Sequence, residues 1–232
     1  MVDPQTLPET HIDHQVAYRL VNTKLPPIHL FDDVANADEF AALHEVQAIT
    51  NPRLLNEAGD LNLLPNEEIP FGIPGCSAAV APFTHVSPDG SRFSNGDFGV
   101  LYLAQTEQGA IEEVSFHQQR YLSQVEGLSF DRLVFRCYVA HFGGCDLVDL
   151  TGLTLDHPVY DPEDYSASQT LGVQLKHRGA SGVQYHSVRR PGDCCWGLFT
   201  PGYVQAMNQG PNYELIWNGS EISFRGKIES SG

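Results

Sequence analysis

The stretch that most constrains the fold of this chain is SRFSNGDFGVLYLAQTEQGAIEEVSFHQQRYL, residues 91–122. It opens with a Gly- and Asn-rich turn that carries Arg92, and an apolar run over residues 100–104 follows. That run predicts a buried strand. The apolar residues of the next segment share one helical face: Ile111, Val114, Tyr121 and Leu122. This spacing predicts a helix of roughly four turns over residues 106–122. The turn with its arginine therefore lies at the mouth of a buried strand.

The rest of the chain mixes strand and helix patterns without a regular alternation. Strand composition occurs in residues 15–21, 132–142, 182–188, 195–199 and 213–224. Helical patterns occur in residues 36–49, which begin with a capping-box-like Asn36 and Glu39, and in residues 166–179. Asn218-Gly219 predicts a two-residue hairpin loop, and residues 58–90, rich in Pro, Gly and Asn, predict mostly loop. We therefore predict an α+β fold in one domain, with mixed, mostly antiparallel sheets and flanking helices.

Charge and length limit the functions that are open to the chain. Its 232 residues are enough for one sizeable core, and 13 Lys and Arg against 29 Asp and Glu give a net charge of −16. Such a surface argues against direct nucleic-acid binding and against an anionic membrane. It permits a basic protein partner. An anionic ligand has to be held by local arginines, because the overall field repels it.

The cysteines and the N-terminus indicate a reducing compartment. The five cysteines are odd in number and form no CxxC pair, so we expect buried free thiols. Residues 1–14 are polar, without a basic region followed by an apolar one, and we interpret them as a lead-in and not as a secretion signal. The HIDH sequence at 11–14 has no third ligand nearby, so no metal is expected. We predict a cytoplasmic protein.

Three residues around the predicted strand form a candidate site. Arg92 stands ten positions before Tyr102, and Glu113 stands eleven positions after it. By helical angle Glu113 lies somewhat nearer the apolar face than Glu112. Spacing alone leaves a second interpretation open, namely a surface arginine, a core tyrosine and a solvated pair of glutamates.

The motifs resemble those of the RES domain family. Residues 90–117, GSRFSNGDFGVLYLAQTEQGAIEEVSFH, resemble its Arg-containing turn followed by a Tyr-Leu-Ala strand and a helix with a Leu-Leu-Glu-Val-type run. SGVQYHSVRRPGDCCWGLF resembles its second signature, with His186 in place of the usual proline, and YELIWNGSEI resembles its closing hairpin. The resemblance covers roughly residues 15–225. It implies a lead-in over 1–14 and a RES-type domain over 15–228 with a long insertion at about 25–90.

The resemblance implies a set of site residues. The Arg, Glu and Ser that name the family match Arg92, Glu113 and Ser187, and Tyr102 also matches. The Tyr-Leu-Ala register selects Glu113 over Glu112. Arg19, in YRLV, resembles a further NAD-contacting position. These residues would bind NAD as the substrate, with Glu113 by the ribose, Arg92 on the diphosphate and Tyr102 against the nicotinamide or ribose. Ser187 would hydrogen-bond to the ribose or the amide, and Arg19 would assist phosphate binding. For Arg189 two interpretations stay open, the same role on the phosphate or a solvated side chain.

The resemblance also implies a fold and an activity. RES proteins are similar in fold to ADP-ribosyltransferases, and they are typically toxins paired with an Xre-type helix-turn-helix antitoxin. The expected function is cleavage of the nicotinamide–ribose bond of NAD, as an NAD phosphorylase or glycohydrolase. The alternatives are a protein ADP-ribosyltransferase that uses the same NAD site and a non-catalytic acidic binding module. The expected partner is an antitoxin that covers the active site in a hetero-oligomer.

Overall fold

The computed structural model describes residues 3–25, 31, 32, 34, 36, 39 and 59–229. Within these residues the strands are β1 (Glu9–Ile12), β2 (Gln15–Asn22), β3 (Leu101–Ala104), β4 (Asp131–Phe142), β5 (Cys145–Asp149), β6 (Gly182–His186), β7 (Cys194–Leu198), β8 (Val204–Trp217) and β9 (Ile222–Lys227). The α-helices of the same residues are α3 (Cys76–Thr84), α4 (Glu107–Leu122) and α5 (Ser166–His177). Short 3-10 helices lie at η1 (Leu61–Leu63), η2 (Asn66–Glu68), η3 (Pro158–Tyr160) and η4 (Pro201–Tyr203).

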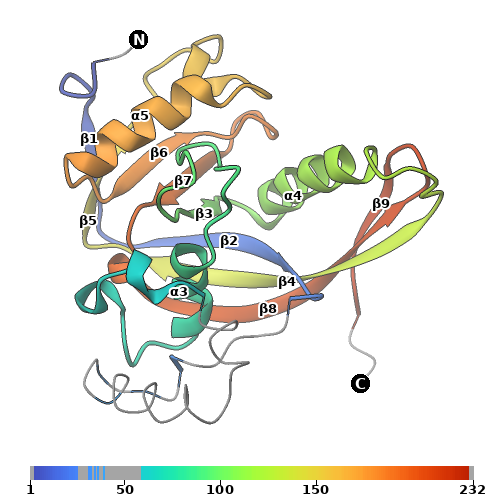
Figure 1. The fold of residues 1–232 in the computed structure, drawn as a ribbon, viewed down its shortest axis with the longest axis horizontal. Helices are drawn as coiled ribbons and strands as arrows, with labels where there is room; N and C mark the ends of the chain where they lie inside the picture. Colours follow the sequence, from blue (N-terminus) through green and yellow to red (C-terminus); the bar gives the residue numbers. More distant parts are fainter. Residues whose placement is uncertain are drawn as a thin grey trace.

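The described strands form one open sheet in the order β1-β5-β6-β7-β3-β2-β4-β8-β9. Neighbouring strands run antiparallel except for β5 and β6, which are parallel. The pairing between β2 and β3 consists of Tyr18 opposite Ala104, so the two halves of the sheet meet at a narrow junction. Figure 1 shows the halves diverging beyond that junction. The prediction of a single-domain α+β fold with a mostly antiparallel sheet and flanking helices is confirmed.

Helices cover both faces of the sheet. α4 and α5 lie on one face and α3 lies on the other (Figure 1). The core is divided accordingly, because side chains alternate between the two faces of a strand. In β3, Leu101 and Leu103 pack on the side of α3, whereas Tyr102 and Ala104 pack on the side of α4. Leu101 is fully buried, and burial of a leucine side chain stabilises a fold by about 1.5–3 kcal/mol. This alternation gives Tyr102 its place beside the helix that follows it.

Most of the predicted elements are present in the structure. The strand predicted over 15–21 is β2, that over 132–142 is β4, and the helices predicted over 106–122 and 166–179 are α4 and α5. The side chain of Thr106 caps α4 by accepting a hydrogen bond from the Gly109 N–H. Of the helix predicted over 36–49, Asn36 and Glu39 belong to the described residues, and the Asn36 side chain accepts a hydrogen bond from the Glu39 N–H at 2.9 Å, as its capping role requires. The rest of that helix lies outside the described residues.

Two local predictions were wrong, those for the hairpin loop and for Tyr121, and two segments contain elements that were not predicted. The segment 58–90, predicted as mostly loop, contains α3, which the surrounding Pro and Gly residues and Pro82 inside it concealed. Part of the polar lead-in is extended as β1, which pairs with β5. The hairpin loop spans residues 218–221, because the Asn218 side chain accepts hydrogen bonds from the N–H groups of Ser220 and Glu221 and holds a wider turn. Tyr121 was placed on the apolar face of α4, but its side chain is exposed.

The cysteines agree with the prediction of free thiols. Cys76, Cys137, Cys145 and Cys195 are buried and free, and Cys194 is free and half-buried. Burial raises the pKa of Cys195 to about 12, so its thiol stays protonated at neutral pH. None of the helices among the described residues is long and apolar enough to cross a membrane.

Candidate active site

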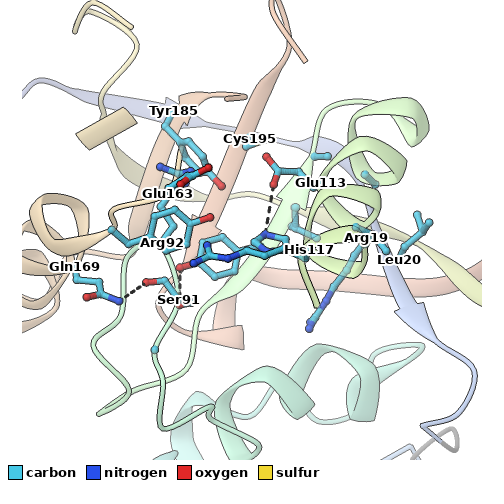
Figure 2. A pocket seen from close by; sticks show the side chains of 18 of the residues that line it. Arg19, Leu20, Ser91, Arg92, Glu113, His117, Glu163, Gln169, Tyr185 and Cys195 are labelled. Atoms are coloured by element: carbon cyan, nitrogen blue, oxygen red, sulfur yellow. Dashed lines mark hydrogen bonds and ion pairs between the residues drawn. The ribbon is translucent and has the colours of Figure 1, made fainter. Parts of the chain in front are cut away.

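A cavity of about 670 Å³ opens on the face of the sheet that carries α4 and α5. Its walls come mainly from five separate parts of the chain: β2 and β3 at the base, α4 on one side, and the 89–92 turn and the 161–166 loop on the other. Such a volume lies in the range of small-molecule sites. Figure 2 shows Arg92, Glu113 and His117 around this space.

The turn that carries Arg92 is anchored by Tyr102. The Tyr102 hydroxyl accepts a hydrogen bond from the Phe93 N–H at 2.8 Å and is hydrogen-bonded to the Ser91 hydroxyl at 2.8 Å. Burial raises the pKa of Tyr102 to about 12, so the hydroxyl keeps its proton. Gly90, within this turn, has φ 76°, and a Cβ there would collide with the carbonyl of Ser94. The turn therefore has one well-defined shape, and β3 positions it.

Arg92 lies in the wall of the cavity with one amino group still available. Only 7% of the residue is exposed. Its Nη1 donates hydrogen bonds to the carbonyl oxygens of Asp161, at 3.0 Å, and Val159, at 3.3 Å, and its guanidinium lies 4.4 Å from the ring centroid of Tyr165. Its Nη2 is buried and has no hydrogen-bond partner in the described part of the chain. A buried donor without a partner is unfavourable, so this group is suited to receive an anionic ligand.

Glu113 reaches the same cavity from α4. Its carboxylate lies 3.8 Å from Nε2 of His117, which is one helical turn further along. Burial raises the pKa of Glu113 above its ordinary value, and the guanidinium groups of Arg189 and Arg92 offset part of this effect. Burial, together with Arg189, Arg92 and Arg120, lowers the pKa of His117, so its imidazole is neutral at pH 7. The site therefore presents a carboxylate beside a neutral imidazole.

The neighbouring carboxylate of Glu112 points elsewhere. It accepts a hydrogen bond from the side-chain amide of Gln108 at 2.8 Å and lies 4.0 Å from the guanidinium of Arg225 on β9. The two glutamates thus occupy different faces of α4, and Glu113 is the one that lines the cavity.

Arg19 and Ser187 are placed less directly. Arg19 borders the cavity, but it lies opposite Tyr138 in the pairing of β2 with β4. Its side chain is therefore on the other face of the sheet from Leu20, which packs on the side of the cavity. Figure 2 shows the Arg19 side chain extending away from Glu113. Ser187 is buried and is not among the residues that line the cavity. Its hydroxyl accepts hydrogen bonds from the N–H groups of Arg190, at 3.0 Å, and Arg189, at 3.3 Å, and so fixes the turn after β6.

Arg189 connects that turn to the cavity. Its guanidinium lies 3.3 Å from the ring centroid of Phe116 on α4 and donates a hydrogen bond to the carbonyl of Pro162. It thereby joins α4 to the 161–166 loop, close enough to Glu113 to lower its pKa. Arg189 is not among the residues that line the cavity.

Several residues of the cavity were not identified from the sequence. His117 and the loop residue Tyr165 are the most notable, and Tyr185 and Gln169 also line the wall. A signal for His117 was present, because residues four apart on a helix are neighbours and Glu113 was already a candidate. Tyr165 and Gln169 reach the site through tertiary packing, for which the sequence carries no local signal. The described residues contain no group of three or more His, Cys, Asp or Glu side chains placed to bind a metal.

Comparison with known proteins identifies the family. The model of the RES domain matches residues 69–218, and the chain belongs to this family. It is 28% identical over 219 residues to the uncharacterized protein y4oC of Sinorhizobium fredii (strain NBRC 101917 / NGR234), with 93% of this chain and 88% of that protein covered. Among solved structures it is similar to a chain of the M. tuberculosis MbcT–MbcA toxin–antitoxin complex, with a TM-score of 0.40 and 15% identity over 55% of this chain and 73% of that one.

Proposed function

We propose that this chain is an enzyme that cleaves the bond between nicotinamide and ribose in NAD. The observation that carries the proposal is the convergence of a guanidinium with an unpaired Nη2, on Arg92, and a partly buried carboxylate, on Glu113, in one cavity of a RES domain protein. Cleavage of NAD uses both groups: the guanidinium binds the diphosphate, and the carboxylate stabilises the positive charge that develops on the ribose as the nicotinamide leaves. The proposed role is that of a toxin that depletes cellular NAD.

The chemistry of the reaction explains why so few groups are needed. The C–N bond breaks with its electron pair passing to the pyridinium nitrogen, so nicotinamide leaves as a neutral molecule and needs no general acid. The ribose gains oxocarbenium character, as a sugar does in glycoside cleavage. A fixed negative charge beside that carbon stabilises the transition state. Glu113 supplies it, while Arg92 holds the diphosphate in place.

The other residues have supporting roles in this proposal. Tyr102 holds the Arg92 turn through its hydroxyl, and its ring forms part of the cavity wall. Ser187 fixes the turn that carries Arg189, which in turn keeps more of Glu113 ionised. Burial lowers the pKa of Arg19 only to about 10, so it remains charged at neutral pH, but its side chain lies on the opposite face of the sheet, and any effect on bound NAD acts through the sheet and not by contact.

The test uses purified protein with NAD, with and without inorganic phosphate. We expect release of nicotinamide, and the second product identifies the acceptor: ADP-ribose for water, its 1-phosphate for phosphate, or a modified protein for a protein acceptor. Glu113→Ala is expected to lower turnover by about 10²–10³-fold with little change in binding. Glu112→Ala, which removes the neighbouring carboxylate outside the cavity, serves as the matched control. An unchanged rate for Glu113→Ala would contradict the proposal.

Arg92 is tested through binding. Loss of a charged hydrogen bond to the diphosphate is expected to weaken ADP-ribose binding by about 10- to 100-fold in Arg92→Ala, measured by calorimetric titration. Because Arg92 is buried, Arg92→Lys provides a second variant that keeps the charge but loses the forked geometry. Equal affinity for all three proteins would exclude Arg92 from the diphosphate site.

The proposal includes a cytoplasmic location and a partner. We infer that an Xre-type helix-turn-helix antitoxin binds this chain and covers the cavity, so that NAD cannot enter until the antitoxin is lost. Addition of the purified antitoxin to the NAD assay is expected to abolish nicotinamide release. Full activity in the stoichiometric complex would contradict the covering of the site.

A further inference from the structure

The cavity is electrically asymmetric. On the α4 side it is lined by the single carboxylate of Glu113 together with His117 and Arg120. On the Arg92 side it is lined by Asp89, Glu163 and Asp164, and these three residues are exposed. A site for an anionic dinucleotide thus has carboxylates concentrated on one side, where they oppose additional negative charge.

The position of these carboxylates is set by Arg92 itself. Its Nη1 donates to the carbonyl of Asp161, and its guanidinium lies against the ring of Tyr165. Glu163 and Asp164 lie between those two contact points in the chain, and both line the cavity that Arg92 lines. The loop is ordered further by the Asp161 carboxylate, which accepts hydrogen bonds from the N–H groups of Glu163 and Asp164, both at 2.8 Å.

On this side of the cavity, within the described part of the chain, Arg92 has an unpaired hydrogen-bond donor and Glu163 has an unpaired acceptor. Arg92 is 7% exposed and its Nη2 has no partner within the described residues, and in the proposed function this group binds the diphosphate. The Asp164 carboxylate accepts a hydrogen bond from the Ser166 N–H, whereas the Glu163 carboxylate makes no hydrogen bond or ion pair within the described residues. Glu163 is therefore available to accept hydrogen bonds from a ligand that is already held by Arg92.

We propose that Glu163, assisted by Asp164, selects dinucleotides with a free ribose 2′-hydroxyl and excludes those with a 2′-phosphate. This inference rests on the proposed function: the nicotinamide end lies at Glu113 and the diphosphate at Arg92, so the adenosine ribose extends toward the 161–166 loop. A carboxylate accepts hydrogen bonds from ribose hydroxyls, which is how acidic side chains distinguish NAD from NADP in other folds. A 2′-phosphate at the same place would meet two like charges. The substrate is then NAD, and NADP is rejected.

The test is calorimetric titration with ADP-ribose and with 2′-phospho-ADP-ribose, so that it does not depend on turnover. Wild-type protein is expected to bind ADP-ribose about tenfold or more tightly than its phosphorylated analogue, because the analogue adds charge next to Glu163 and Asp164. Glu163→Gln is expected to reduce the ratio of the two affinities about fivefold. Asp164→Asn, which keeps an acceptor for the Ser166 N–H, is expected to reduce it to a smaller extent. Glu126→Gln removes an exposed carboxylate outside the cavity lining and should leave the ratio unchanged.

The outcomes separate this inference from the proposed function. A preference for ADP-ribose that is smaller in Glu163→Gln than in the wild type supports the selection. It does so even if no nicotinamide is released from NAD, because the absence of nicotinamide release overturns only the proposed reaction. Equal binding of the two ligands by the wild type overturns the selection even if NAD is cleaved. A ratio that is the same in Glu163→Gln and in the wild type also overturns it, and so does binding of neither ligand.

Discussion

At the scale of single residues, the ionisation of Glu113 is controlled by two opposing effects. Burial raises the pKa of Glu113, and the guanidinium of Arg189, with that of Arg92, lowers it. Removal of the Arg189 charge leaves burial less opposed, so the pKa of Glu113 rises further and the carboxylate is protonated at a higher pH. Because the proposed reaction needs the ionised form, the acid limb of the kcat/KM profile in Arg189→Gln is expected to move to higher pH.

The matched control for this prediction is Arg189→Lys. Lysine keeps a positive charge near Glu113 but loses the planar guanidinium that lies on the ring of Phe116. Its acid limb should stay close to that of the wild type, although its folding stability falls. If the pH profiles of Arg189→Gln and wild type superimposed, Arg189 would have no electrostatic effect on the carboxylate.

The candidate site residues differed in how far the sequence could place them. The Tyr-Leu-Ala register is a local sequence signal, so Tyr102 and the choice of Glu113 over Glu112 could be predicted from it. In the structure Tyr102 and Glu113 line the cavity, whereas Glu112 faces Arg225. Strand alternation within β2 puts Arg19 on the face of Tyr138, whereas its expected role came from the resemblance to the family and not from that alternation. The direction of the Ser187 side chain, just after β6, is not set by alternation, because its hydroxyl accepts hydrogen bonds from the backbone N–H groups of residues 189 and 190.

At the scale of elements, β3 holds the Arg92 turn through Tyr102, and this leads to a second prediction, on stability and ligand binding. Tyr102→Phe removes the hydroxyl that accepts from the Phe93 N–H and bonds to Ser91, and it leaves a backbone donor unsatisfied. Loss of such a group lowers the free energy of unfolding by about 1–3 kcal/mol. We expect that loss in urea denaturation, together with weaker ADP-ribose binding as the turn loosens. Tyr121→Phe, which removes an exposed hydroxyl from α4, should change neither quantity.

A second prediction at this scale concerns the contact of α5 with the same turn. Gly172 lies in α5, and a Cβ at this position would overlap the carbonyl and Cα of Phe93. In an isolated helix, Gly→Ala is stabilising by about 1 kcal/mol. Here we expect Gly172→Ala to be destabilising, because backbone on both sides has to separate, and the displaced turn should also bind ADP-ribose more weakly. Gly152→Ala, where a Cβ meets nothing within 4 Å, is the control for the denaturation and binding measurements. Equal stability of Gly172→Ala and wild type would show that α5 does not press on the turn.

The elements themselves were predictable where their periodicity is strong. α4, α5, β2 and β4 carry clear helical or strand patterns, and each was found within a few residues of its predicted bounds. α3 was missed because Pro82 and the flanking glycines oppose a helix locally, and packing of Val80 and Phe83 against the sheet stabilises it. The first half of β8 is polar, and it becomes a strand because β4 supplies its hydrogen-bond partners.

At the scale of the whole molecule, the site results from the order of strands in the sheet. Separate stretches of the chain supply the Arg92 turn, Glu113 and the 161–166 loop, and β3 lies beside β2 and β7 in the described sheet. That order could not be deduced from the sequence, since each pairing joins segments far apart in the chain. The net charge of −16 adds a second property of the whole molecule, because binding of any anionic ligand then depends on the local field of its few arginines.

The last prediction concerns the chain inside a cell. If the cavity cleaves NAD, expression of the chain without a partner in a bacterial host is expected to lower the NAD content, measured by an enzymatic cycling assay, before growth stops. Glu113→Ala, expressed to the same level, should leave both NAD and growth close to those of the empty vector. Glu112→Ala should inhibit as the parent does, because its carboxylate faces Arg225 and not the cavity. If Glu113→Ala were as inhibitory as the parent, growth arrest would come from the acidic surface binding a host component, and the enzymatic interpretation would be wrong.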